Sequence, residues 1–254
     1  MAGFSGGIRS KEYLIRIQKV AKDYSCGKLA VKALRPSSLT LEVGEFVLLQ
    51  GPSGSGKTTL LSIMGCLMKP TSGRVSICGK DVTEMGEGEL PQVRLHHIGF
   101  IFQTFNLFPA LTAFENVKLA LLLKGYGWLQ RRKEARRLLE RVGLGECMNR
   151  KPGELSGGQR QRVCIARALA GEADIILADE PTAALDTTTG FSIMELLKQE
   201  VRSGNKAALI VSHDPRLECF ATRVDHITDG VLTVGQPMRH RAPVPAHEIM
   251  SVGA

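Results

Sequence analysis

The segment GPSGSGKT at positions 51–58 constrains the fold of this 254-residue chain more than any other feature. An apolar run, Phe46–Gln50, precedes it as a predicted strand, and Leu60, Leu61 and Met64 follow it at helical spacing. A glycine-rich loop between a strand and a helix aims backbone N–H groups and the positive end of the helix at phosphate oxygens. The pattern GxxxxGK[ST] in this setting predicts a phosphate-binding loop rather than a plain glycine-rich turn.

Each residue type in this loop has a chemical reason. Lys57 supplies a mobile positive charge for the terminal phosphates of a nucleotide, and the Thr58 hydroxyl is a suitable Mg²⁺ ligand. We therefore expect ATP and Mg²⁺ as cofactors. The residues expected to contact the nucleotide here are Gly51, Pro52, Ser53, Gly54, Ser55, Gly56, Lys57, Thr58 and Thr59.

The rest of the chain alternates short apolar runs with longer helical periods. Further strands are predicted at Ile98–Phe102, Ile175–Asp179 and Ala207–Ser212. This alternation predicts an α/β fold with a mostly parallel sheet covered by helices. Near the end of the chain, Asp229-Gly230 lies between two alternating runs and predicts a β-hairpin.

The segment between the predicted strands Ile98–Phe102 and Ile175–Asp179 has a different, helical pattern. Residues 104–154 are predicted to be mainly helical and to form an inserted lobe, and we expect one domain over 12–235 with a flexible tail over 236–254. One face of the lobe is predicted to be buried by Ala135, Leu138, Leu139 and Val142.

Composition excludes several classes of protein. Hydrophobic residues make up 43% of the chain, which excludes wholesale disorder, and no apolar stretch approaches the roughly 18 residues of a membrane span. Lysine and arginine number 33 against 25 acidic residues, a net charge of +8 that suits a nucleotide, nucleic acid or an anionic membrane surface. The first residues have no secretory pattern, and Ala2 excludes myristoylation, so we expect the chain in the cytoplasm.

The cysteines form no CxxC pair, and most have apolar neighbours. This pattern favours reduced, buried thiols over zinc ligands or disulfides. The six cysteines are Cys26, Cys66, Cys78, Cys147, Cys164 and Cys219.

Two carboxylates, Asp179 and Glu180, come at the end of the predicted strand Ile175–Asp179. Open α/β sheets bind ligands at the carboxyl ends of their strands. We expect Asp179 to hold Mg²⁺ together with Thr58, and Glu180 to orient and deprotonate a water that attacks the γ-phosphate. A strand-end Asp-Glu pair is weak evidence alone and becomes strong downstream of a phosphate-binding loop.

The string LSGGQ at 155–159 is followed by RQRVCIARAL, which is predicted to be helical. Its serine and two glycines therefore lie at the start of a helix. Taken alone, this string fits an N-capped helix. It also provides a second anion-binding helix start, after the phosphate-binding loop at 51–58. The two helix starts together are suited to binding one ATP from both sides. With the motifs above, LSGGQ makes residues Tyr13 to about Gly235 resemble the nucleotide-binding subunit of an ATP-binding cassette (ABC) transporter. The resemblance implies a P-loop NTPase (RecA-like) core, an antiparallel β subdomain and the inserted helical lobe.

The resemblance also implies roles for individual residues. The LSGGQ loop of one copy would close on the phosphate-binding loop of a second copy, in a head-to-tail dimer with two composite ATP sites. In that dimer the nucleotide would also be contacted by Ser156, Gly157, Gly158 and Gln159.

Four further positions match family motifs. Gln103 resembles the glutamine that reaches Mg²⁺ and the attacking water, and His213 resembles the histidine that hydrogen-bonds the γ-phosphate. Asp186 resembles an aspartate that crosses the dimer interface, and Tyr24 an aromatic residue that stacks on adenine. Without their motifs, Gln103 fits a polar strand end and His213 a structural histidine.

A basic helix is predicted within the lobe. It is explained either by a solvated face or by contact with anionic headgroups or acidic partner loops, since this lobe faces the membrane in the family. The basic residues Arg131, Arg132, Lys133, Arg136, Arg137 and Arg141 face only two acidic ones, Glu134 and Glu140.

Three stretches resemble the MacB, LolD and FtsE group of ABC ATPases: residues 51–83, residues 98–117 and the signature segment 153–163. Many of those relatives have the sequence GNLD where this chain has AALD at 183–186. The sequence AALD is more similar to that of DevA-type subunits, which serve exporters paired with a periplasmic adaptor. The resemblance therefore implies an ATPase at the cytoplasmic face of the inner membrane, peripherally bound, that drives a permease in an export or mechanotransmission system, with a periplasmic adaptor.

Two alternatives differ in output. An FtsE-like regulatory ATPase would act through a permease on a cell-wall enzyme, with the same site chemistry. A soluble ABC ATPase acting on nucleic acid or ribosomes is disfavoured, because those types need long coiled coils or two cassettes in one chain. We therefore expect no nucleic-acid partner.

Overall fold

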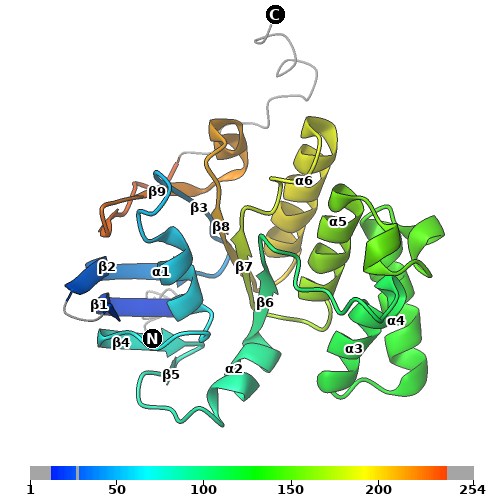
Figure 1. Cartoon of the computed structure of the whole chain (residues 1–254), viewed down its shortest axis with the longest axis horizontal. Helices are drawn as coiled ribbons and strands as arrows, with labels where there is room; N and C mark the ends of the chain where they lie inside the picture. The colour runs from blue at the N-terminus through cyan, green and yellow to red at the C-terminus, as the bar shows by residue number, and fades with distance from the viewer. Residues whose placement is uncertain (1–12, 27–28, 239–254) are drawn as a thin grey trace, which may run out of the picture.

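The computed structural model describes residues 13–26 and 29–238, and a six-stranded sheet forms its centre (Figure 1). The strand order is β10-β9-β3-β8-β7-β6, and only the pair of β10 with β9 is antiparallel in this sheet. Its strands are β3 (Phe46–Gln50), β6 (Ile98–Ile101), β7 (Ile175–Asp179), β8 (Ala207–Val211), β9 (Arg223–Thr228) and β10 (Val231–Thr233).

A second sheet, antiparallel throughout, has the order β2-β1-β4-β5. It provides the antiparallel subdomain that the family resemblance implied. Its strands are β1 (Tyr13–Cys26), β2 (Leu29–Glu42), β4 (Ser72–Ile77) and β5 (Lys80–Asp81).

Six α-helices and three short 3₁₀ turns connect these strands in the described part of the chain. In that part, none of the helices combines the length and the apolar character needed to span a bilayer. The helices are α1 (Lys57–Met64), α2 (Leu90–His97), α3 (Ala113–Leu123), α4 (Trp128–Arg141), α5 (Gly157–Ala168) and α6 (Thr187–Ser203), and the turns are η1 (Gly145–Cys147), η2 (Pro152–Glu154) and η3 (Pro215–Phe220).

The central sheet is covered on both faces, because successive strand residues point to opposite sides. Phe46 and Leu48 of β3 belong to a core cluster built with α3, α4, α5 and α6. Val47 and Leu49 belong to a second cluster built with α1, α2 and the antiparallel sheet. Helices α1 and α5 therefore lie on opposite faces of the central sheet, as Figure 1 also shows.

Most of the predicted elements are confirmed, with small differences at strand ends. Strands β3 and β7 have the predicted bounds, whereas β6 and β8 end one residue early, at Ile101 and Val211. Phe102 instead accepts a turn hydrogen bond from the Phe105 N–H (3.4 Å), and the Ser212 hydroxyl accepts one from the Asp214 N–H (3.2 Å). Local turn formation thus ends both strands.

Two other local predictions are confirmed. Asp229 and Gly230 have φ values of 49° and 75° between β9 and β10, which is the conformation of a two-residue hairpin turn. The predicted lobe face is buried, at 0–4% exposure for Ala135, Leu138, Leu139 and Val142. Residues 1–12 and 239–254, which include the chain start and most of the predicted tail, lie outside the described residues.

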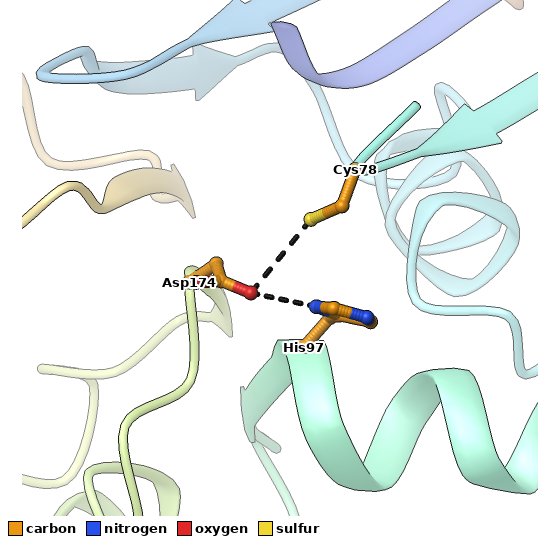
Figure 2. Close-up of side chains that lie close together, drawn as sticks. All are labelled: Cys78, His97 and Asp174. Carbon is orange, nitrogen blue, oxygen red and sulfur yellow. Dashed lines mark hydrogen bonds and ion pairs between the residues drawn. The ribbon is translucent and has the colours of Figure 1, made fainter. Parts of the chain in front are cut away.

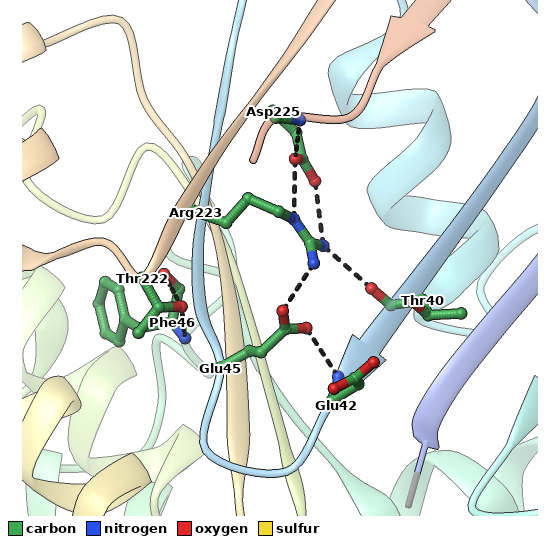
Figure 3. A network of polar contacts seen from close by, with 8 residues as sticks. Thr40, Glu42, Glu45, Phe46, Thr222, Arg223 and Asp225 are labelled. Atoms are coloured by element: carbon green, nitrogen blue, oxygen red, sulfur yellow. Dashed lines mark hydrogen bonds and ion pairs between the residues drawn. The ribbon is translucent and has the colours of Figure 1, made fainter. Parts of the chain in front are cut away.

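A buried ion network joins the two sheets (Figure 3). The Arg223 guanidinium of β9 donates to Asp225 (2.9 Å), to Glu45 (2.6 Å) and to the Thr40 carbonyl of β2 (2.9 Å). Asp225 is fully buried and Arg223 is 6% exposed. Losing one partner of a buried ion pair typically costs about 3–5 kcal/mol, so this network holds the antiparallel sheet firmly against β9.

Candidate functional site

The loop at 51–56 leaves β3 and turns directly into α1. Gly54 and Gly56 have φ values of 76° and 106°, in the left-handed region that disfavours other residues. A Cβ at Gly51 would lie 2.0 Å from the Ile227 carbonyl oxygen, so only glycine fits there. Sequence and packing therefore both fix the path of this loop.

Helix α1 begins without a side-chain cap, since its N-cap residue is Gly56. The amide of Leu60 donates to the Gly56 carbonyl (2.9 Å), which leaves the preceding amides of the first turn for an outside acceptor. The buried Ser55 hydroxyl, 3% exposed, also makes no hydrogen bond to any described residue. Uncapped amides and a buried unpaired hydroxyl fit an anion such as phosphate.

Lys57 folds back over this loop. Its ammonium donates to the carbonyl oxygens of Gly51 (2.8 Å) and Pro52 (2.7 Å). The positive charge therefore lies at the mouth of the loop, beside the free amides.

Asp179 meets the same loop from β7. The Thr58 hydroxyl donates to its carboxylate at 3.0 Å, and the aspartate is 7% exposed. Burial raises the pKa of Asp179, and the Thr58 hydrogen bond and the Lys57 charge partly offset this. A hydroxyl and a buried carboxylate are hard oxygen ligands, so the pair fits Mg²⁺.

Glu180 and His213 form the other polar pair of the site. His213 Nδ1 lies 2.9 Å from a Glu180 carboxylate oxygen, and Glu180 has the unusual φ of 50°. The Glu180 amide donates to the Val211 carbonyl (3.0 Å), which holds this strained backbone in place. The hydrogen bond to Glu180 raises the pKa of His213, aided by the charge of the same carboxylate.

Gln103 and Tyr24 approach the site from other elements. Gln103 is exposed in the turn after β6. The last residue of β6, Ile101, pairs with Ala178 of β7, so Gln103 lies at the same end of the sheet as Asp179. Tyr24 is 39% exposed and its hydroxyl lies 3.4 Å from the Thr59 hydroxyl on α1. Tyr24 therefore lies directly beside α1.

The LSGGQ segment lies elsewhere. Ser156 caps α5, accepting from the Gln159 amide (3.2 Å), while the Gln159 side chain accepts from the Ser156 amide (2.9 Å). Helix α5 packs on the sheet face opposite to α1.

The two glycines of LSGGQ and Asp186 share this part of the molecule. A Cβ at Gly158 would lie 3.2 Å from a Leu185 methyl, and the space beside Gly157 borders Ala184. Asp186 is exposed and caps α6 by accepting from the Thr189 amide (2.9 Å). In one copy, these residues are thus grouped with each other and not with the phosphate-binding loop.

The sequence did not predict that Glu180 and His213 touch. The strand pattern contained the signal, because Glu180 comes one residue after β7 and His213 two residues after β8, and these two strands are neighbours in the sheet. The cysteine prediction also needs correction, since Cys219 is exposed and Cys78 and Cys147 are half-buried, while Cys66 and Cys164 are buried. Cys78 lies in the turn between β4 and β5 and Cys147 ends η1, where apolar neighbours in sequence do not ensure burial.

The pairing of His213 with Glu180 makes a testable pH prediction. NMR titration of the imidazoles should give His213 a pKa above the ordinary value near 6.5, and Glu180→Gln should lower it towards that value. The contact therefore stabilises the fold below pH of about 6.5 and ceases to do so as pH rises through the raised pKa. Exposed His96 serves as the control, and an unchanged His213 pKa in Glu180→Gln would contradict the pairing.

Comparison with known proteins identifies the family. Residues 34–183 match the family described as ABC transporter. An uncharacterized ABC transporter ATP-binding protein of Thermotoga maritima is 47% identical over 217 residues, 85% of this chain and 92% of that protein. The macrolide export ATP-binding/permease protein MacB of Hyphomonas neptunium is 44% identical, over 85% of this chain and 34% of that protein.

A solved structure agrees with this result. The ATP-binding cassette MJ0796 of Methanocaldococcus jannaschii, a dimeric post-hydrolysis state bound to ADP and Pi, superposes with a TM-score of 0.84 at 44% identity. The match covers 90% of this chain and 99% of that one. The chain therefore belongs to the ABC transporter family, as one of its ATP-binding cassette ATPases.

Proposed function

We propose that two copies of this chain pair head to tail around two ATP molecules and use hydrolysis to drive a membrane permease. The observation that carries this proposal is that α1 and α5 lie on opposite faces of one sheet. One copy cannot present both its phosphate-binding loop and its LSGGQ segment to the same nucleotide, so a second copy must supply the latter. The dimeric state of MJ0796 supports this arrangement.

In each composite site, the loop amides and Lys57 hold the phosphates of ATP, and Tyr24 stacks on the adenine. Thr58 and Asp179 hold Mg²⁺, with Gln103 reaching it from the neighbouring strand end. Bound Mg²⁺ supplies charge neutralisation at the phosphates. The partner copy contributes the helix start at 156–159, and the exposed Asp186 crosses the interface.

In this proposal Glu180 acts as the general base, and its place directly after β7, next to Asp179, supports that role. It orients a water and accepts its proton as the water oxygen bonds to the γ-phosphorus and the bond to the ADP oxygen breaks. His213, held by Glu180 at 2.9 Å, is placed to donate to a γ-phosphate oxygen as charge develops there. Products are ADP and phosphate.

Substitutions separate binding from hydrolysis in this proposal. Glu180→Gln should lower the ATPase rate at least about 100-fold while leaving ATP affinity near that of the unmodified protein, because the amide cannot accept the proton. Lys57→Ala should weaken ATP binding itself. Turnover and fluorescent-nucleotide binding are the measurements, with exposed Glu87→Gln as the matched control.

An ATPase rate for Glu180→Gln close to that of the Glu87→Gln control would rule out Glu180 as the base. Equal ATP affinity in Lys57→Ala would argue against the phosphate role of the loop lysine.

The helical lobe is the surface proposed to meet the permease. Large apolar side chains are exposed there, on α3 and α4 and in the segment before α3, and a group of exposed apolar side chains is typical of an interaction surface. MacB of Hyphomonas neptunium carries an ATP-binding and a permease part under one name, and the match covers 34% of that protein, which supports a permease as the partner of this chain. The exposed residues are Phe108, Leu122, Leu123, Trp128 and Leu129.

Part of the basic charge on α4 is already paired. Arg137 pairs with Glu134 and Arg141 with Glu200, both at 2.5 Å, and the Arg132 guanidinium lies over the Trp128 ring. The ion pairs of Arg137 and Arg141 favour a solvated face for that side of α4, whereas Arg132 lies with Trp128 at the proposed permease surface.

The proposed location of the protein is the cytoplasmic face of the inner membrane, where it would serve an export or mechanotransmission system with a periplasmic adaptor. In this proposal Gln103 links the ATP site to the helical lobe.

Photocrosslinking tests the permease surface. A photoreactive amino acid in place of Leu129, which is 72% exposed, should yield an adduct with an integral membrane protein in cells. The matched control is Val231, 48% exposed on β10, which should give none. Equal labelling at both positions, or no membrane adduct at Leu129, would contradict the proposed docking surface.

A further inference from the structure

Three potential metal ligands from distant parts of the sequence converge away from the ATP site (Figure 2). Cys78 follows β4, His97 ends α2, and Asp174 directly precedes β7. The Cys78 thiol donates to Asp174 Oδ2 at 3.7 Å, and His97 Nδ1 lies 2.6 Å from the same oxygen. All three ligand atoms lie within 4.8 Å of one another.

We propose that Cys78, His97 and Asp174 form a zinc site. A thiolate, an imidazole and a carboxylate are the three protein ligand types that Zn²⁺ takes. The thiolate excludes Mg²⁺ and Ca²⁺ as natural occupants, because these hard cations take oxygen ligands. The inference does not rest on the proposed transport function.

The geometry needs side-chain movements of at most about 1.5 Å, since no two of the three ligand atoms are more than 4.8 Å apart. Tetrahedral zinc with ordinary bond lengths places its ligand atoms about 3.3–3.6 Å apart. The 3.7 Å between Cys78 Sγ and Asp174 Oδ2 already fits, and the 2.6 Å contact of His97 must open by under about 1 Å. The side chains of His97 and Asp174 are 26% and 39% exposed, which leaves them room to rotate and leaves a fourth position for water.

Charge is balanced in such a site. A thiolate and a carboxylate neutralise Zn²⁺, while the imidazole stays neutral. This matters because Lys124 is close enough to Asp174 for their charges to interact, and burial lowers the pKa of that lysine to about 8. Zinc binding would release the Cys78 thiol proton to solvent and leave the site without net charge, so no net positive charge would stand beside Lys124.

The site lies at the end of β7 opposite to Asp179. Asp174 and Asp179 are separated by the length of the strand Ile175–Asp179, about 16 Å at the usual rise per residue. The backbone of Asp174 is anchored, since its carbonyl accepts from the Ala207 amide at 2.9 Å. Bound zinc would therefore tie the β4–β5 corner and α2 to the central sheet, without entering the ATP site.

Metal titration of the reduced, chelator-treated full chain tests this assignment. Zn²⁺ should bind at one ion per chain in competition with a chromogenic chelator and raise the melting temperature. Co²⁺ should give the near-ultraviolet charge-transfer band of a thiolate-bound, four-coordinate ion, a signal that Asp179, Glu180 and His213 cannot produce.

Matched variants assign the ligands. Cys78→Ser should abolish the Co²⁺ band, and His97→Asn should weaken Zn²⁺ binding at least about ten-fold. The controls Cys219→Ser and His96→Asn, which change an exposed thiol and the exposed neighbouring histidine, should leave both signals unchanged. Unchanged melting of the metal-free variants shows that they fold.

Two results would overturn the proposal. The first is the absence of a thiolate band in the unmodified protein, which would make the cluster a hydrogen-bonded group only. The second is Zn²⁺ binding that Cys78→Ser and His97→Asn leave unchanged, which would place the ion elsewhere.

Discussion

In-register parallel pairing of β3, β8 and β7 is the constraint on which the whole site depends. Leu49 pairs with Val211, and Val211 pairs with Asp179, so three strands end side by side. The Ser212 amide extends this ladder to the Leu49 carbonyl (3.3 Å), and the Glu180 amide to the Val211 carbonyl (3.0 Å). Fully buried strands hold this register, because a slip of one residue would turn every side chain to the other face.

The two faces of the same sheet explain why the proposed machine needs two copies. Alternation along β3 assigns Leu49 to the face covered by α1 and Leu48 to the face covered by α5. The phosphate-binding loop and the LSGGQ segment each expose a helix start, but on different sides of the chain. Association of two copies is therefore part of the proposed chemistry, and its reversal after hydrolysis would supply movement to a permease.

Much of the central sheet could be predicted, because buried parallel strands are continuous apolar runs beside motifs of fixed spacing. The bounds of β3 and β7 follow directly from them. The exact residue at which a strand ends depends on local turn hydrogen bonds, such as that from the Asp214 amide to the Ser212 hydroxyl. The pattern of apolar residues does not predict such bonds. Contacts between distant residues could not be predicted either: His97 and Cys78 contact Asp174 from 77 and 96 residues away, and no spacing motif relates the three. The roles assigned to individual site residues stay predictions.

Light scattering of Glu180→Gln with ATP and Mg²⁺ tests the central claim most directly. If ATP is held between two copies, this slowed variant should have twice the 27.6 kDa mass of one chain, and it should return to the single mass without nucleotide. Adding Ser156→Arg, which places a bulky cation at the exposed start of α5, should prevent pairing while leaving ATP binding intact. A Glu180→Gln protein that binds ATP yet keeps the mass of one chain would contradict the account, as would pairing that survives Ser156→Arg.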